Sequence, residues 1–316
     1  GGTSVDSIKI ETIETKSKVF LLGNHNKPGF LKAVARYIVL AGIGFVYVYP
    51  LIYMISKSFL SPEDLADPSV IWIPTGIYFD NFKKAFSVLD FWNCLKNSII
   101  VSVVAAILQT ISTSFVSYGL ARFKLPLKKV FIVLIVATFF IPVEITTVPR
   151  YVLFYRYGFI NTLLPSYLPA LFVQGLNSAI FILVFFMFFK SYPLAFDEAA
   201  SIDGAGRFKI FYKIALPMSK PAILVSILFS TVWYWNETAQ SQMYYGNKFP
   251  SLMHRLSEFS SRFASAMKET GGGSTTPTQA IILAATMLTM LPMILFYLAT
   301  QKQFISSIEY SGITGE

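Results

Sequence analysis

Charged residues are scarce in this chain: they make up 14% of its 316 residues, whereas hydrophobic residues make up 54%. Soluble domains of average composition carry roughly 25% charged residues, so this composition indicates that lipid covers much of the surface. Cysteine and histidine are scarce as well, since Cys94 is the single cysteine and the two histidines are His25 and His254. We therefore expect no intrachain disulfide framework, no metal site and no catalytic cluster.

Two further patterns are missing from the sequence. Residues 1–30 lack the short apolar core and the cleavage site of a signal peptide, so we expect residues 1–36 to form a cytoplasmic N-terminal tail. The Walker A pattern G-x4-G-K-[ST] occurs nowhere. The chain therefore lacks the phosphate-binding loop that an ATPase of that type would need.

Long apolar runs, in contrast, are abundant. A helix needs about 20 residues to cross a hydrocarbon core of ~30 Å. Backbone polar groups must be satisfied within each segment in lipid, and the runs lack the alternation of a membrane barrel. The predicted fold is all-α and integral to the membrane, with a six-helix transmembrane domain over 37–300 and a cytoplasmic C-terminal tail over 301–316. Its six predicted transmembrane helices cover residues 37–59, 98–120, 130–152, 168–189, 221–239 and 279–299.

Lysine and arginine in the short connections predict the orientation, because basic loops stay in the cytoplasm. The connection after the second span is basic and has no acid; it contains Arg122, Lys124, Lys128 and Lys129. The connection after the fourth span carries Lys190, Arg207, Lys209, Lys213 and Lys220. Both termini are then predicted to be cytoplasmic, and the chain to cross the membrane several times. The net charge of +9 follows from this bias, so we expect no nucleic acid partner.

The segment 190–220 is too polar to span the membrane, and it reads as two short helices joined by a glycine-rich turn. Asp197 and Glu198 favour a helix start, where acids complement the helix dipole. Pro217 ends the second helix just before the fifth span. Small residues between them would let the surface of another protein approach the backbone closely; they are Ala199, Ala200, Gly204, Ala205 and Gly206.

Seven residues of this segment keep a fixed spacing: Glu198-Ala199-Ala200, three residues, Gly204, nine residues, Ile214, one residue, and Leu216-Pro217. The pattern resembles the EAA loop of importer-type ABC permeases. The resemblance implies a type I ABC importer permease whose cytoplasmic coupling helix docks in a cleft of an ATPase. An amphipathic hairpin without this role is the alternative. The implied coupling residues are Glu198, Ala199, Ala200, Asp203, Gly204, Ala205, Gly206, Arg207, Phe208, Ile214, Leu216 and Pro217.

Further segments resemble the second permease of carbohydrate importers of the maltose-transporter-like family. They are NSI at 97–99, SYGLARFKLPLKK at 117–129, INTLLP at 160–165, WYWNE at 233–237 and QKQFISSIEYSGITGE at 301–316. The resemblance implies a second permease subunit as heterodimer partner, two cytoplasmic ATPase subunits that bind ATP and Mg, and an extracellular or periplasmic sugar-binding protein. It also implies that the membrane is that of a bacterial cell, and that this chain binds no cofactor and is no enzyme.

The C-terminal end resembles the glycine-rich tail of this family, which in the maltose system reaches between the ATPase subunits. The resemblance implies that Tyr310, Ser311, Gly312 and Gly315 contact the ATPases. Ile313 and Thr314 stand where the family more usually has Val and Lys, and a frayed terminus is the alternative. The segment 240–278 is predicted to be a long extracellular loop, and its polar start departs from the family pattern.

Polar residues within or at the ends of spans are costly and mark candidate pathways for solutes. Glu144, Asn236 and Glu237 are the candidates here, since sugar hydroxyl groups suit carboxylates and amides. The resemblance implies that the sister permease holds most of the sugar contacts. Three other functions remain open: an ABC importer for a peptide, amino acid or phosphate, a secondary transporter or channel without need of ATP, and a membrane scaffold that transports nothing.

Overall fold

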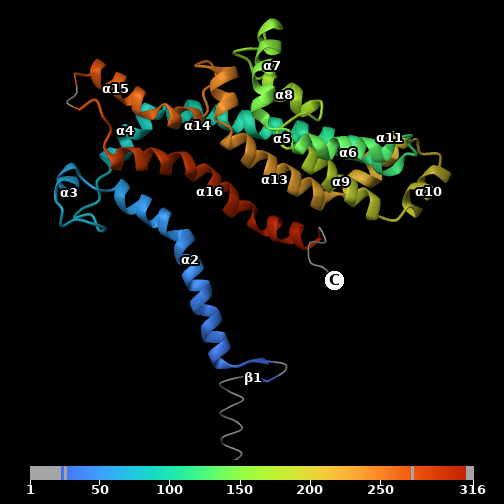
Figure 1. The fold of residues 1–316 in the computed structure, drawn as a ribbon, viewed down its shortest axis with the longest axis horizontal. Coiled ribbons are helices and arrows are strands. Elements are labelled where there is room, and N and C mark those ends of the chain that lie inside the picture. The colour runs from blue at the N-terminus through green and yellow to red at the C-terminus, as the bar shows by residue number, and fades with distance from the viewer. Residues whose placement is uncertain (1–22, 25–26, 272–273, 311–316) are drawn as a thin grey trace, which may run out of the picture. The chain divides into compact units, whose positions relative to one another are not determined.

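The computed structural model of the chain describes residues 23–24, 27–271 and 274–310 (Figure 1). The chain divides into two compact units, residues 1–78 and residues 79–316. In the described residues every element is helical except one pair of two-residue strands. This agrees with the predicted all-α fold.

The first unit is built around one long apolar helix. Strands β1 (Gly23–Asn24) and β2 (Lys27–Pro28) pair in antiparallel register, and helices α2 (Phe30–Ser58) and α3 (Pro62–Ala66) follow. Of the α2 side chains, Met54 and Ser58 are buried, whereas apolar side chains are exposed along most of the helix. A helix that exposes so much apolar surface is stable against lipid or a partner, not against water.

The second unit contains the remaining helices, including two π-helical turns, η1 and η2. In chain order they are α4 (Asp80–Leu89), α5 (Phe91–Arg122), α6 (Lys128–Phe139), α7 (Val143–Arg156), α8 (Leu164–Leu171), α9 (Ser178–Ser191), α10 (Ala195–Ile202), α11 (Arg207–Ile210), η1 (Phe211–Ala215), α12 (Leu216–Met218), α13 (Lys220–Asn236), η2 (Ser241–Tyr245), α14 (Leu252–Ser257), α15 (Phe259–Glu269) and α16 (Gln279–Tyr310).

Helix α5 forms the centre of this unit. It packs against α13, α9 and α8, while α16 packs against α4 and α13, and Figure 1 shows α13 running beside α5 and α9. The buried face of α5 is rich in small residues, among them Ala105, Ala106, Ser112, Thr113 and Ser117. Small side chains let helix backbones approach closely, which is how helices pack in membranes.

Three described helices are long and apolar enough to cross a membrane alone: α2, α5 and the Gln279–Gln303 part of α16. Three bent pairs pass the same test when each pair is taken together. These pairs are α6 with α7, α9 with α10, and α11–α12 with α13. By length and composition the structure thus holds up to six spans, as predicted from the sequence.

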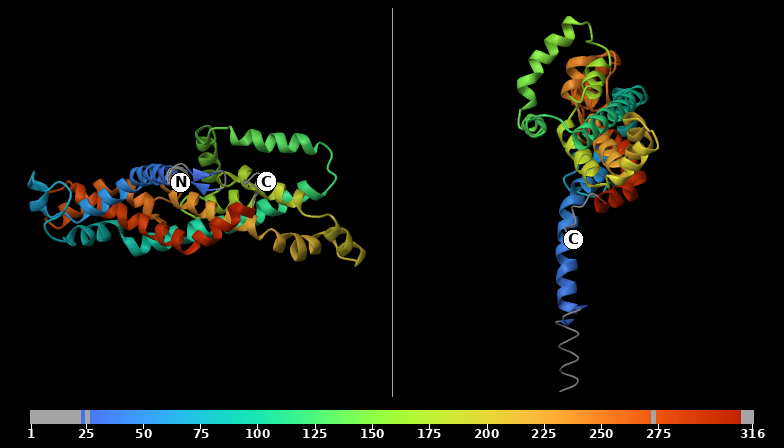
Figure 2. Two further views of the ribbon diagram at one scale, coloured as in Figure 1. Left: turned by 90° about the horizontal axis from the view of Figure 1, so that it is seen from below. Right: turned by 90° about the vertical axis from the view of Figure 1, so that its right-hand side faces the viewer.

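The predicted third span, residues 130–152, differs from a single helix. Helix α6 ends at Phe139, α7 begins at Val143, and the two helices meet at 94°. Pro142 explains the break, because it has no backbone N–H to donate and disfavours helical backbone at the preceding Ile141. No side chain of α6 is buried, and Figure 2 shows α6 running along the outside of the α5–α9–α13 bundle.

The predicted fourth span, residues 168–189, is also interrupted. Helix α8 ends at Leu171 and α9 begins at Ser178, so residues 172–177 are irregular. Val173 and Asn177 have left-handed backbones with φ of 65° and 52°. Left-handed residues end a helix, because they break its run of hydrogen bonds. Only α9, with 14 residues, continues as the apolar part of the predicted span.

Candidate coupling loop and translocation-path residues

The segment 190–220 forms an elbow at one end of the second unit. Helix α10 makes an angle of 72° with α9, and α11–α12 make an angle of 77° with α13. The elbow thus lies across the direction of the spans that it connects, and Figure 1 shows α10 and α11 beyond the ends of α9 and α13. We predicted two short helices joined by a glycine-rich turn, and the structure has this arrangement.

Gly204 makes the turn between α10 and α11. Its φ is +76°, a conformation that glycine adopts at no steric cost. The turn ends α10 through hydrogen bonds from Gly204 N to Ser201 O at 3.1 Å and from Ala205 N to Ala200 O at 2.9 Å. Apart from its two chain neighbours, no heavy atom of the described residues lies within 4 Å of the position that a Cβ of Gly204 would occupy. The turn is therefore open toward its surroundings.

The first half of the EAA pattern is a surface. Glu198, Ala199, Asp203, Gly204, Gly206, Arg207 and Phe208 are exposed, while Ala200 and Ala205 are half-buried. Large apolar side chains stand among them, with exposed fractions of 86% for Ile202 and 70% for Phe208. Apolar side chains beside charged ones are typical of a surface that another protein covers.

The second half of the pattern is packing. Ile214 and Leu216 are half-buried, and Leu216 packs against the aromatic cluster around Phe189 and Phe211. Pro217 is exposed in α12, which continues from η1 without a break. The predicted coupling residues up to Phe208 are therefore mostly exposed, whereas Ile214 and Leu216 support them from within.

One acid of this loop has a place that the sequence did not reveal. Asp197 was predicted only to favour the start of a helix, yet its side chain is 6% exposed and pairs with Arg122 at the end of α5. The separation of Arg122 Nε and Asp197 Oδ2 is 3.3 Å. Sequence spacing carries no signal for this pair, because its members lie on different helices.

A second cluster holds the break between α8 and α9. Gln109 Nε2 donates to Leu176 O at 2.6 Å, and Tyr234 OH accepts from Leu176 N at 3.2 Å. Ser112 Oγ donates to Ala170 O at 2.6 Å. These side chains supply the hydrogen bonds that the interrupted helix loses. Gln109 was missed in the sequence, although an amide within an apolar run is itself a signal of function or structure.

Two small cavities lie where α13 meets η2. The first, of about 10 Å³, has the room of one water molecule. The second, of about 50 Å³, lies between α7 and the chain after α13. Glu237 lines both cavities, and its Oε1 accepts a hydrogen bond from Gln240 N at 3.0 Å. The second cavity is lined with polar groups that include Thr146, Thr147 and Arg150.

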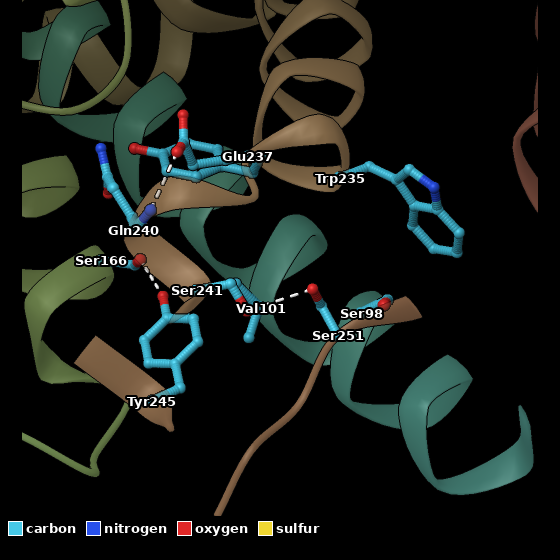
Figure 3. Close-up of a pocket in the computed structure, with 10 residues that line it drawn as sticks. Ser98, Val101, Ser166, Trp235, Glu237, Gln240, Ser241, Tyr245 and Ser251 are labelled. Atoms are coloured by element: carbon cyan, nitrogen blue, oxygen red, sulfur yellow. Dashed lines mark hydrogen bonds between the residues drawn. The ribbon is translucent and has the colours of Figure 1, made fainter. Parts of the chain in front are cut away.

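Figure 3 shows how side chains close the first cavity. Ser166 and Tyr245 are hydrogen bonded to each other, and so are Ser241 and Ser251, the latter at 3.1 Å. The Glu237 carboxylate lies beside Gln240 in the same view. The serine and tyrosine hydroxyl groups are buried and paired with one another, so the cavity that they close can hold a water molecule.

The other predicted pathway residues lie elsewhere. Asn236 and Glu144 are exposed and line neither of these two cavities. Glu144 stands in the first turn of α7, directly after the break at Pro142. Of the predicted tail contacts, Tyr310 is the last residue of α16, whereas Ser311, Gly312 and Gly315 lie outside the described residues.

A bundle with up to six apolar spans defines a multi-pass membrane protein. The chain belongs to the family described as binding-protein-dependent transport system inner membrane component, whose model matches residues 98–308. This match confirms the predicted membership of the ABC importer permeases and excludes the secondary transporter. It also makes the chain a membrane component of a system that has a binding protein.

Relatives in several bacteria agree with the predicted carbohydrate group. The chain is 30% identical to the polygalacturonan/rhamnogalacturonan transport system permease protein YtcP of Bacillus subtilis, over 85% of this chain and 93% of the relative. It is 27% identical to the arabinooligosaccharides transport system permease protein AraQ of Halalkalibacterium halodurans, over 87% and 94%. It is 29% identical to the melibiose/raffinose/stachyose import permease protein MelC of Bacillus subtilis, over 79% and 86%. The resemblance to carbohydrate-uptake permeases is thereby confirmed.

A solved structure shares the fold. One chain of a bacterial ABC transporter involved in the import of the acidic polysaccharide alginate matches with a TM-score of 0.70 at 20% identity. The match covers 85% of this chain and 95% of that chain. The predicted fold of an importer permease is confirmed by this likeness.

Proposed function

We propose that this chain forms half of the translocation pathway for a sugar or oligosaccharide in a binding-protein-dependent ABC importer. The observation that carries the proposal is the exposed elbow around Gly204, in a chain that matches the importer permease family over residues 98–308. The named solutes of YtcP, AraQ and MelC are all carbohydrates, which supports a sugar over a peptide, an amino acid or phosphate.

The proposal assigns the chemistry to partners. Two ATPase subunits bind ATP and Mg, one of them docks on the exposed residues from Glu198 to Phe208, and this chain binds no cofactor. A second permease completes the pathway as a heterodimer, and an extracellular or periplasmic binding protein delivers the solute. Both termini then face the cytoplasm, since the elbow does, and the tail around Gly312 reaches the ATPases.

Alternating access follows from this arrangement. Closure of the ATPases around ATP carries the elbow, and the two permeases move from an inward-facing to an outward-facing state. Hydrolysis supplies the free energy, while this chain transmits the motion. Glu237 contributes a hydrogen-bonding group to the path, and Asn236 belongs to its outer rim.

A substitution at the elbow tests the docking role. We expect Gly204→Trp to abolish ATP-dependent uptake by the assembled complex in liposomes while the subunit remains in the membrane. Gly158→Trp is the matched control, because Gly158 also has a positive φ, +70°, and open space around it, yet lies outside the elbow. Full uptake by the Gly204→Trp complex would contradict docking at this turn.

The solute class needs its own experiment. Uptake of labelled neutral oligosaccharides, uronate-containing oligosaccharides, peptides and phosphate can be compared with the same wild-type complex and its binding protein. We expect competition and accumulation only with carbohydrates. Accumulation of peptide or phosphate would replace the sugar assignment and leave the coupling role intact.

A further inference from the structure

A buried ion pair joins the elbow to the central helix of the bundle. Arg122 is the last residue of α5, and Asp197 stands in the first turn of α10. Their side chains are 4% and 6% exposed, and Arg122 Nε lies 3.3 Å from Asp197 Oδ2. Neither of these two atoms has a hydrogen-bond partner among the described residues, so at these atoms each charge has the opposite charge as its neighbour.

Tyr192, between α9 and α10, closes the cluster. Its hydroxyl donates to Asp197 Oδ1 at 2.5 Å, and its carbonyl oxygen accepts from Arg122 Nη2 at 2.7 Å. The Arg122 guanidinium lies 3.8 Å from the centroid of the Tyr192 ring. Burial and the hydrogen bond to Asp197 raise the pKa of Tyr192. The hydroxyl therefore stays protonated and continues to donate.

An aromatic cluster packs beside these three residues. Tyr118 lies one turn before Arg122 on α5, and its ring centroid is 5.5 Å from that of Phe189 and 5.1 Å from that of Phe211. Phe189 belongs to α9 and Phe211 to η1, so the ends of three elements meet here. Offset and edge contacts of this kind resist sliding, because each ring fits between its neighbours.

The cluster differs from the rest of the elbow in its exposure. Asp197 is buried, whereas Glu198, the next residue, and the turn around Gly204 are exposed. The exposed side is free for a docked protein, and the buried side is fixed to α5. Helix α5 in turn packs on α8, α9 and α13, and through Gln109 it holds the break near Leu176.

We propose that Arg122 and Asp197, braced by Tyr192, are positioning residues that make the elbow and α5 move as one body. The inference rests on the proposed function, because it assumes that an ATPase moves the elbow. When the ATPase pulls on the exposed turn, the buried pair carries the displacement into α5, and α5 carries it to the helix break. Without the pair, the elbow follows the ATPase while α5 lags behind.

We call the contact among Arg122, Asp197 and Tyr192 the lock. It is tested by the number of ATP molecules hydrolysed per solute molecule imported. This number is measured on the full complex with its binding protein in liposomes. We expect Asp197→Asn and the double variant Arg122→Leu/Asp197→Leu to raise this number roughly two- to thirtyfold, the range over which a network residue alters coupling. The double variant is essential, because it leaves no unpaired buried charge and so keeps assembly intact.

Three further variants complete the design. Tyr192→Phe removes one hydroxyl and keeps the ring, so we expect a smaller rise in the number of ATP per solute. Arg122→Lys retains the charge and is expected to lie between wild type and the double variant. Asp80→Asn is the matched control, because the Lys83–Asp80 pair is exposed, with side-chain exposures of 78% and 48%, and should leave the number unchanged.

The outcomes separate the lock from the proposed function. If the wild-type complex does not couple ATP hydrolysis to uptake, the proposed function fails and the lock fails with it. If the wild-type complex is coupled, and the assembled double variant and Tyr192→Phe are coupled equally well, the lock alone is overturned. A rise in ATP per solute for both variants, with no change for Asp80→Asn, supports it.

Discussion

Gln109 on α5 donates a hydrogen bond of 2.6 Å to the carbonyl oxygen of Leu176, in the break between α8 and α9. Tyr234 on α13 donates to Gln109 Oε1 at 2.7 Å and accepts from Leu176 N at 3.2 Å. Both backbone groups of Leu176 are thus satisfied by side chains from two other helices. An interrupted helix needs such partners wherever water is absent.

Gln109, Tyr234 and Leu176 form a triangle of hydrogen bonds, and replacing Gln109 tests whether this triangle stabilises the break. Gln109→Leu leaves Leu176 O without its donor and Tyr234 OH without its acceptor. A buried group left without a partner costs about 1–3 kcal/mol, so we expect the variant to unfold in detergent at a lower temperature than wild type. Fluorescence-detected size exclusion after heating measures this temperature. Gln174→Leu is the control, since Gln174 is exposed in the same break. Equal thermal stability of Gln109→Leu and wild type would show that the triangle contributes nothing.

The backbone of Gly175 lies close to the triangle, and the absence of a side chain at this position makes the close approach possible. A Cβ at this position would lie 2.4 Å from both Gln109 Oε1 and Tyr234 OH, and 3.1 Å from Ala170 Cα. Gly175→Ala should therefore push the triangle apart and destabilise the protein by about 1–3 kcal/mol, as overpacked sites do. The same unfolding assay measures this loss.

The control for Gly175 is another glycine of the same unit. Gly119 in α5 has its nearest neighbour, in Phe123, at 4.0 Å from a Cβ. Gly119→Ala should be neutral or slightly stabilising, because alanine favours a helix more than glycine does. A Gly175→Ala variant as stable as Gly119→Ala would mean that the break adapts to the extra methyl group.

The break also shows where prediction from the sequence ended. Hydropathy placed the apolar runs, and the spacing from Glu198 to Pro217 placed the elbow, because both signals are local. The interruption at residues 172–177 depends on Gln109 and Tyr234, which are distant in the chain, so the local run reads as one span. Arg122 and Asp197 were hidden for the same reason, since a pair across helices leaves no periodic pattern.

Prolines in the sequence predict some of the bends in the helices but not all of their positions. Pro142 lies in the third predicted span, and the structure bends there by 94° between α6 and α7. Pro50 lies within α2 and Pro292 within α16, yet both helices continue through them. A proline predicts a weak point in a helix, and the packing around it decides whether the helix breaks.

The exposed apolar side chains of the elbow give a prediction about docking. Ile202→Asp and Phe208→Asp place a charge where we propose that the ATPase packs. We expect each to weaken the binding of the ATPase subunit by about 1–2 kcal/mol, as central contact residues do. Less ATPase should then co-purify with the variant, and uptake should fall in parallel. Ile73→Asp is the control, because Ile73 is equally exposed, at 82%, in the other unit. Normal co-purification of the ATPase with both elbow variants would show that it docks on other residues.

Glu237 gives a prediction about the solute path. Glu237→Gln keeps the size of the side chain and an oxygen that can accept from Gln240 N, but it removes the charge. Hydrogen bonds to charged groups contribute about 1.5–3 kcal/mol, against about 0.5–1.5 kcal/mol for neutral ones. We therefore expect the half-saturating concentration of solute-loaded binding protein to change little, while the maximal rate of uptake falls roughly tenfold, as a loss of about 1.4 kcal/mol in the path would produce.

The control is Glu144→Gln, because Glu144 is exposed and lines neither of the cavities that Glu237 lines. Hydrolysis of ATP should stay normal in both variants, since neither residue belongs to the elbow. Equal losses of uptake in Glu144→Gln and Glu237→Gln would indicate a general effect of charge near the outer end of α13, and the cavities would then have no special part in the path. A loss confined to Glu237→Gln supports a solute path that passes beside Glu237, between the end of α13 and η2.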